Sequence, residues 1–366
     1  MDAHHHMCVM GSAEGPDYGA QVRAVVVTEP GGPEVLAVQD VPEPVPGPGE
    51  VLVAVEAAGV NRADLLQRAG AYPPPPGAAP WPGLEAAGVV LAVGPAADEA
   101  ATSRTTKGAA EPARGARSDE LAVGDRVAVL LAGGGYAERV VVSAALALRV
   151  PEAVSPVEAG ALPEALATVW SNLREAQAAP GETVLVRGGS GGIGSIAVPL
   201  ARLLGLRVIA TAGGPQRVAR VAALGADVAL DHRADDLADQ VLAATDGRGV
   251  DVVLDVLGAG GLEDNVRVLA TGGRLVVIGL QKGRRGTLDL GTLMARRGRV
   301  IATTLRSREP ADKARIMAEV REHVWPFVVD GRLRPVVHRT LGLDDAARAH
   351  ELLASGEVFG KLVLVP

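Results

Sequence analysis

A glycine cluster directly after a short apolar run carries the clearest chemical signal in this chain. The run is Val184 to Val186, and residues 189–194 fit the G-x-G-x-x-G spacing before a helix-like stretch, residues 195–204. Glycine permits a sharp turn and close approach of a phosphate to the backbone, and a helix N-terminus offers free N–H groups. A plain tight turn is the alternative, but strand, loop, helix and a second strand over 207–212 follow in order. The segment therefore predicts a dinucleotide-binding loop formed by Gly188, Gly189, Ser190, Gly191, Gly192, Ile193 and Gly194.

The residues after the second strand bear on which dinucleotide binds. A protein that binds NAD usually places Asp or Glu about 20 residues beyond the loop, where it holds the ribose hydroxyls. Residues 195–226 contain no acidic residue, whereas Arg217 follows the turn that begins at Gly213. A planar guanidinium matches a 2'-phosphate. A solvated helix face is the alternative for Arg217, but the pattern predicts NADPH in preference to NADH, with Gly213 and Arg217 at its adenosine end.

Length and composition limit the class of protein. The chain has 366 residues, which predicts about two domains that each bury a core. Lys and Arg total 36 against 43 Asp and Glu, a net charge of −7, so no overall basic field would hold nucleic acid or an anionic membrane. No apolar run approaches the ~20 residues needed to cross a bilayer, and the N-terminus lacks the apolar core of a secretion signal. With one cysteine, Cys8, we expect a cytoplasmic protein without a disulfide framework.

The first part of the chain indicates an antiparallel β domain over residues 22–152. Residues 1–21, which include His4 to His6, show no periodicity and are expected to form a disordered extension. Residues 96–120 are small, polar and charged without apolar spacing, which indicates a solvated insertion. Apolar, β-branched runs between Gly and Pro turns predict strands at 22–28, 36–39, 51–57, 88–93, 126–131 and 137–142.

The pattern changes near Val157 to alternating helices and strands. The strands expected there are 208–212, 228–230, 250–256 and 274–278, which predict a parallel, doubly wound sheet over residues 153–304 with both faces covered. Ligands of such sheets bind at the carboxyl ends of the strands. Residues 305–366 then predict one long helix over 311–329, a strand at 336–339, a helix over 343–353 and a strand at 361–365. We expect this tail to return to the first domain.

Several motifs in this order resemble the medium-chain dehydrogenase/reductase superfamily, and within it the zinc-free NADPH:quinone oxidoreductases related to zeta-crystallin. Besides the glycine loop, the motifs are Gly49–Val53, Ala58–Asp64, Pro82–Gly88, Val123–Val127 and Gly360–Leu364. The resemblance covers residues 22–366 and implies an α/β fold with a GroES-like catalytic β domain and a Rossmann domain. It also implies homodimers or homotetramers.

The residues argue against a zinc site. Structural and catalytic zinc sites need Cys, His or carboxylate ligands at suitable spacing. Between Cys8 and His232 the chain has neither cysteine nor histidine. In zinc-dependent members of the resembling superfamily, a cysteine stands at the position of Asn61 and a histidine at that of Leu84. We therefore expect no metal.

The resemblance places Asn61, Asp64 and Tyr72 on a segment that faces the nicotinamide. The Asn61 amide can donate to a substrate oxygen or to cofactor hydroxyls, although an Asn that only holds a turn is the alternative. Asp64 can bond the ribose or orient a neighbour, and capping of the helix expected over residues 62–68 is its alternative. Tyr72 offers a flat ring and a phenol, and packing against the following prolines is its alternative.

Further cofactor contacts are implied by position in the resembling family. Thr168 would lie near the nicotinamide, and His232 near the adenine, where relatives have a tyrosine. Ile278 and Thr303 would line the nicotinamide pocket or serve the core. Lys361 would reach the cofactor or end a strand at the surface.

Together these inferences predict an enzyme in which NADPH binds between the domains and passes hydride to a quinone or a related conjugated carbonyl, without metal. Reduction of an enone or alkenal double bond needs the same hydride geometry and is one alternative. A non-catalytic nucleotide-binding or redox-sensing protein is the other.

Overall fold

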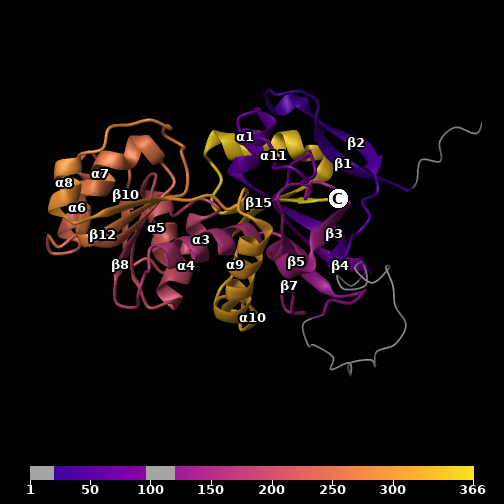
Figure 1. Cartoon of the computed structure of the whole chain (residues 1–366). Helices are drawn as coiled ribbons and strands as arrows, with labels where there is room; N and C mark the ends of the chain where they lie inside the picture. Colours follow the sequence, from indigo (N-terminus) through magenta and orange to yellow (C-terminus); the bar gives the residue numbers. More distant parts are fainter. Residues whose placement is uncertain (1–19, 96–119) are drawn as a thin grey trace, which may run out of the picture.

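The computed structural model describes residues 20–95 and 120–366, and the strands of these residues form three sheets (Figure 1). The predicted extension, with its histidines and Cys8, falls almost wholly on residues 1–19, and the predicted insertion on 96–119, so both lie outside the described residues. The first strand begins at Gln21, one residue before the predicted start of the fold.

A seven-stranded sheet with the order β14-β15-β3-β4-β5-β7, and β6 paired to β3, builds the N-terminal part. Its alternating apolar residues are buried, as the periodicity predicted. The strand predicted at 137–142 is observed as β6, which begins at Arg139 and ends at Ser143. The short strand β7 was not predicted. The strands are β3 (Glu50–Val60), β4 (Glu85–Val93), β5 (Arg126–Leu130), β6 (Arg139–Ser143), β7 (Ala147–Arg149), β14 (Val337–Gly342) and β15 (Lys361–Val365), with β1 (Gln21–Val27) and β2 (Leu36–Pro42) as a separate pair.

A six-stranded parallel sheet with the order β10-β9-β8-β11-β12-β13 forms the second part. This is the strand order of a Rossmann fold, with the switch point between β8 and β11. The prediction of a doubly wound parallel sheet is confirmed, although β13 was missed. The strands are β8 (Thr183–Val186), β9 (Arg207–Ala212), β10 (Val228–Asp231), β11 (Val250–Asp255), β12 (Leu269–Val277) and β13 (Arg299–Ala302), with helices α4 (Gly194–Leu203), α5 (Pro215–Ala223), α6 (Leu237–Ala243), α7 (Leu262–Arg267) and α8 (Leu290–Ala295).

The C-terminal residues return to the first sheet, where β15 pairs with β3 and α11 (Ala346–Ser355) lies beside α1 (Arg62–Arg68) (Figure 1). The prediction of a single helix over residues 311–329 is wrong. It is divided into α9 (Pro310–His323) and α10 (Trp325–Val329), because Pro326 lacks an N–H to continue the ladder of α9. The helix predicted from residue 343 likewise begins as a 3-10 turn, Leu343–Asp345.

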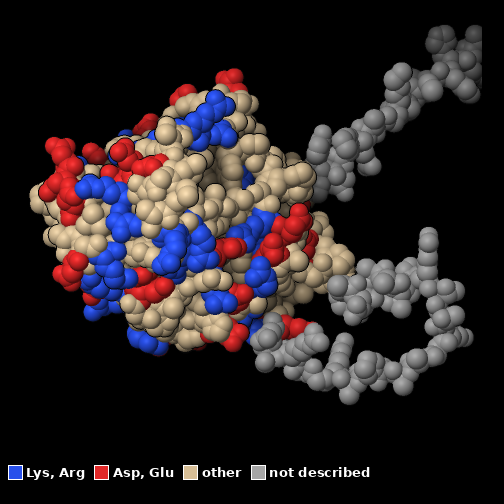
Figure 2. Space-filling model, turned by 60° about the vertical axis from the view of Figure 1, so that its left-hand side comes forward, with Lys and Arg blue, Asp and Glu red and all other residues tan. Residues whose placement is uncertain are grey.

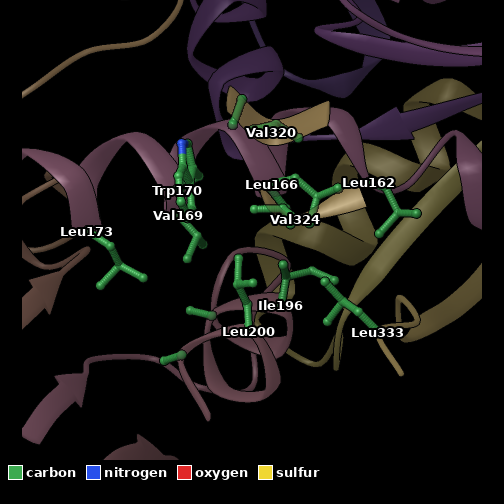
Figure 3. Packing of buried hydrophobic residues seen from close by; sticks show 14 of the residues in the cluster. Leu162, Leu166, Val169, Trp170, Leu173, Ile196, Leu200, Val320, Val324 and Leu333 are labelled. Atoms are coloured by element: carbon green, nitrogen blue, oxygen red, sulfur yellow. The ribbon is translucent and has the colours of Figure 1, made fainter. Parts of the chain in front are cut away.

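One apolar cluster joins the helices that connect the two sheets. In α3 (Pro163–Glu175), residues 166, 169 and 173 are three and four positions apart, so they share a face and pack with Ile196 and Leu200 of α4 (Figure 3). Val320 of α9 and Val324, which follows it, belong to the same cluster. Because α3 also contacts β4 and β5, it connects the first sheet with the helices that cover the second. A further short α-helix is α2 (Pro156–Ala159).

In the two described ranges of the chain, no helix is both long and apolar enough to cross a membrane.

Candidate functional site: a basic cavity over the glycine loop

The loop between β8 and α4 has a conformation that requires glycine. Gly188 has a φ of +79°, and a Cβ at Gly194 would lie 2.1 Å from the carbonyl oxygen of Gly188. Thr211 of β9 braces the loop, because its hydroxyl accepts from the Gly188 N–H at 3.1 Å and its carbonyl accepts from the Gly189 N–H at 2.7 Å. Within the described residues, the N–H groups of Gly192 and Ile193 have no acceptor. The loop therefore offers free donors to an anion.

A cavity of about 400 Å³ lies over this loop and is lined by residues from both parts of the protein. The predicted site residues that line it are Asn61, Gly188, Ser190, Gly191, Gly192, Ile193, Gly194, Arg217, His232 and Lys361. The structure does not bring the remaining predicted residues to its wall. These are Asp64, Tyr72, Thr168, Gly189, Gly213, Ile278 and Thr303.

The cavity wall is basic although the whole chain carries a net charge of −7. Its charged lining residues are Arg62, Arg187, Arg217, Lys282 and Lys361, and neither Asp nor Glu is among the lining residues. On the outer face shown in Figure 2, by contrast, basic and acidic side chains are interspersed. A pocket of one charge sign attracts a ligand of the opposite sign, so the cavity suits a polyanion.

Arg187 was missed by the sequence reasoning and is the most informative of these basic residues. It follows β8 directly and is only 5% exposed. Its Nε has no hydrogen-bond partner, and burial lowers its pKa. A buried, unpartnered guanidinium nitrogen at the wall of a cavity is costly unless a ligand supplies an acceptor. The signal in the sequence was an arginine set between an apolar strand and a glycine loop.

The adenosine end of the predicted site is formed by the turns after β9 and β10. Arg217 lies in the first turn of α5, and the His232 ring is so near the turn that a Cβ at Gly213 would lie 3.1 Å from it. Burial, with a smaller effect of Lys282, lowers the pKa of His232 and favours the neutral imidazole. Arg233, also missed, lies beside the same turn.

At the other end of the cavity, Asn61 and Lys361 share a buried carboxylate, Glu85. The Lys361 ammonium donates to Glu85 Oε1 and, at 2.7 Å, to Asn61 Oδ1, while Asn61 Nδ2 donates to Glu85 Oε1 at 2.9 Å. Lys361 is 2% exposed and Glu85 is fully buried. The sequence reasoning missed Glu85, although a glutamate that opens an apolar strand was a usable signal. The Asn61 amide is therefore held in one orientation at the cavity wall.

The structure favours the capping alternative for Asp64. Its carboxylate accepts from the backbone N–H of Asn61 at 2.7 Å and of Gly83 at 3.1 Å, and from the Tyr136 hydroxyl at 3.1 Å. Asp64 is fully buried, and burial raises its pKa to about 6. The network continues from Tyr136 to His350, whose pKa burial lowers to about 3. Asp64 thus orients the Asn61 segment from behind the cavity wall.

The other predicted nicotinamide contacts form a second group beyond the cavity. The Tyr72 hydroxyl lies 3.3 Å from Thr304 Oγ1, and the Tyr72 ring lies 5.1 Å below the Arg306 guanidinium. Thr303 donates to Asn172, which donates to the carbonyl of Thr168. Ile278 packs against the core cluster, which is its alternative role.

No described residues bring together three His, Cys, Asp or Glu side chains that could hold a metal ion. The amide of Asn61 is engaged with Lys361 and Glu85 instead.

A Rossmann sheet with a basic cavity over its glycine loop, closed on one side by a β domain, defines a dinucleotide-dependent oxidoreductase of the alcohol dehydrogenase type. Comparisons with known proteins agree with that class. Residues 47–152 match the model of the alcohol dehydrogenase GroES-like domain, and residues 224–364 match that of a zinc-binding dehydrogenase.

Solved structures superpose on nearly the whole chain over nearly all of their own length. A Pseudomonas syringae quinone oxidoreductase is 31% identical with a TM-score of 0.79, over 94% of this chain and 100% of the other. An NAD-dependent alcohol dehydrogenase is 34% identical with a TM-score of 0.78, over 94% and 99%. The Escherichia coli quinone oxidoreductase complexed with NADPH is 28% identical with a TM-score of 0.77, over 94% and 99%.

The chain belongs to the medium-chain dehydrogenase/reductase superfamily and to its zinc-free quinone oxidoreductase-like family, and it is an oxidoreductase. Curated relatives also include a phenolphthiocerol/phthiocerol polyketide synthase polypeptide of Mycobacterium tuberculosis, which is 33% identical over 340 residues. The match covers 92% of this chain but only 14% of that relative, so the chain spans a small part of the synthase.

Proposed function

We propose that the protein is an NADPH-dependent, metal-free oxidoreductase that reduces a quinone or a related conjugated carbonyl. The observation that carries the proposal is the basic cavity over the glycine loop, with Arg217 at the adenosine end. When bound, the reduced nicotinamide supplies the hydride. The protein supplies orientation, exclusion of water and hydrogen bonds.

Named residues fit each part of this cofactor. The free N–H groups of Gly192 and Ile193 would hold the diphosphate, beside Lys361, whose ammonium is paired with Glu85. Arg217 would pair with the 2'-phosphate, and the unpartnered Nε of Arg187 would gain an acceptor. The cavity thus contains donors and charges for the anionic groups of NADPH.

The substrate would lie beyond the Asn61 end of the cavity. Asn61 Nδ2 already donates to Glu85, so we propose that Asn61 acts mainly by positioning. Tyr72 is partly exposed, and Thr304 is its one hydroxyl partner within the described residues, so its phenol is able to donate to a substrate oxygen.

Steady-state assays with naphthoquinones and alkenals, each with NADPH and with NADH, test this proposal. We expect naphthoquinone reduction with the higher kcat/KM for NADPH. Preference for alkenals would favour the enone reductase alternative, which the same hydride geometry allows. Tight NADPH binding without oxidation by any acceptor would favour a nucleotide-binding or redox-sensing protein instead.

We also propose that two copies pair along β13, giving a homodimer, with a homotetramer as the alternative. Strand β13 is an edge of the parallel sheet as far as the structure describes it, and exposed edges template pairing with another chain. Apolar side chains nearby are exposed, namely Leu290 at 62%, Met294 at 77% and Val300 at 40%. Light scattering after gel filtration should give an oligomer for the native chain and a monomer for Val300→Lys. A monomeric native chain would contradict this assembly.

A further inference from the structure

Glu164 lies in the first turn of α3, where that helix meets the Glu85 end of the cavity wall. Its backbone N–H donates to Glu85 Oε2 at 3.0 Å, and the other oxygen of Glu85 holds Asn61 and Lys361. Glu164 is therefore separated from two cavity-lining side chains by one shared carboxylate. Nothing in the sequence pattern singled it out, because a glutamate in a first helical turn is ordinary.

The carboxyl group of Glu164 has no partner of its own. Among the described residues, it makes no hydrogen bond and no ion pair, although the side chain is only partly exposed. A carboxylate usually accepts several hydrogen bonds when it is removed from water. An unpartnered carboxyl in an interior position is best accommodated in its neutral, protonated form.

The charged groups that act on Glu164 come from several elements around the start of α3. Asp64 of α1 and Glu85 of β4 oppose its ionisation, whereas Lys361 of β15 and Arg306 favour it. Lys313 of α9 is also within electrostatic reach. Burial and the negative charge of Glu85 dominate and raise the pKa of Glu164 to about 8. The carboxyl is therefore largely protonated at neutral pH.

Thr168, which the family resemblance places near the nicotinamide, follows Glu164 by four residues in α3, so the two side chains share one helix face, and both are partly exposed. Arg306 lies over the Tyr72 ring and is within electrostatic reach of Glu164. The partial exposure gives the carboxyl a route to water.

We propose that Glu164 is a catalytic residue that supplies the proton accompanying hydride transfer; this rests on the proposed reductase function. The acceptor gains a hydrogen and an electron pair as hydride from the reduced nicotinamide, and a proton from Glu164. The carboxyl O–H bond breaks as the new bond to the acceptor forms, and the resulting carboxylate takes a proton from water. The acceptor is reduced by two electrons, the nicotinamide is oxidised by two, and Glu164 is restored.

The decisive variant is Glu164→Gln, which keeps the size of the side chain and removes its acidic proton. General acid catalysis contributes about 10²–10⁴-fold, so kcat for quinone reduction should fall at least about 100-fold with little change in the KM for NADPH. For the native enzyme, kcat should decline about tenfold per pH unit above pH 8, and this limb should be absent in the variant. Glu164→Asp should restore part of the rate.

Glu175→Gln is the matched control, because Glu175 ends the same helix with 46% of its side chain exposed in an ion pair with Arg308. It should leave kcat and the pH profile unchanged. A readout independent of turnover is a ¹³C NMR titration of the free protein, in which the Glu164 carboxyl signal is assigned by its loss in Glu164→Gln. We expect that signal to titrate near pH 8.

Retention of kcat and of the alkaline limb in Glu164→Gln would overturn this role while leaving the reductase function intact. Titration of the Glu164 carboxyl near pH 4.5 in the free protein would overturn it as well. A native protein that binds no nucleotide and reduces no acceptor would overturn both proposals together.

Discussion

Replacing Lys361 with Met tests the buried cluster that fixes the cavity wall. Lys361 and Glu85 are 2% and 0% exposed, so their ion pair is removed from water. In Lys361→Met, Glu85 keeps donors from Asn61 and the Glu164 backbone but loses its only cation within the described residues. Removing one partner of a buried pair costs about 3–5 kcal/mol, because the remaining charge is uncompensated. We expect the free energy of unfolding to fall by this amount.

Urea unfolding of the free protein, followed by far-ultraviolet circular dichroism, measures this loss. The double variant Lys361→Met with Glu85→Gln should be more stable than Lys361→Met alone, because the uncompensated charge is gone. Arg348→Met is the control. It breaks an exposed ion pair with Glu351 and should cost less than about 1 kcal/mol. The reasoning is refuted if Lys361→Met costs no more than the control, or if the double variant is no more stable than the single one.

Four further outcomes follow from the same structure. Arg217→Ala should raise the dissociation constant of NADPH about 10–100-fold, because a charged hydrogen bond is lost, and should leave that of NADH unchanged. An equal change in both dissociation constants, measured by titration, would exclude a role of Arg217 in binding the 2'-phosphate. Gly194→Ala should destabilise the fold by more than about 2 kcal/mol, because its Cβ would meet the Gly188 carbonyl at 2.1 Å, whereas a Cβ at Gly191 finds only an ordinary contact at 3.6 Å. Urea midpoints that agree for Gly194→Ala and Gly191→Ala would contradict this. Burial lowers the pKa of His350 to about 3, so below pH 6.5 the unfolded chain binds a proton at this histidine that the folded chain does not. On acidification from pH 6.5 to 5 the native protein should therefore lose up to about 2 kcal/mol of unfolding free energy relative to His350→Gln. A difference between the two proteins that does not change with pH would refute this. Dialysis against a chelator should leave turnover intact, because the described residues contain no cluster of metal ligands. Loss of turnover that only added zinc restores would contradict the metal-free mechanism.

The glycine loop and the alternation of strands were predictable because their signals are local. The spacing of residues 188–194 and the strand-loop-helix order are contained in about two dozen adjacent residues. The backbone freedom of each glycine comes from its own lack of a Cβ and needs no distant partner. The same locality explains the error at residues 311–329, where apolar periodicity continues through a break that Pro326 imposes.

The wall of the site could not be predicted because it depends on contacts between distant residues. Lys361 and Glu85 are 276 positions apart, and neither indicates its partner. Asp64 had two plausible roles, and only its burial behind Gly83 and Tyr136 distinguished them. The pKa of Glu164 likewise depends on burial and on charges from other elements.

Calorimetric titration of the purified protein with NADPH tests most directly whether the basic cavity holds this coenzyme. We predict saturable binding of one NADPH per chain, weaker binding of NADH, and loss of binding in Gly194→Ala. The account is contradicted if the folded native protein binds no NADPH, or if Gly194→Ala remains folded and binds it as tightly as the native chain does.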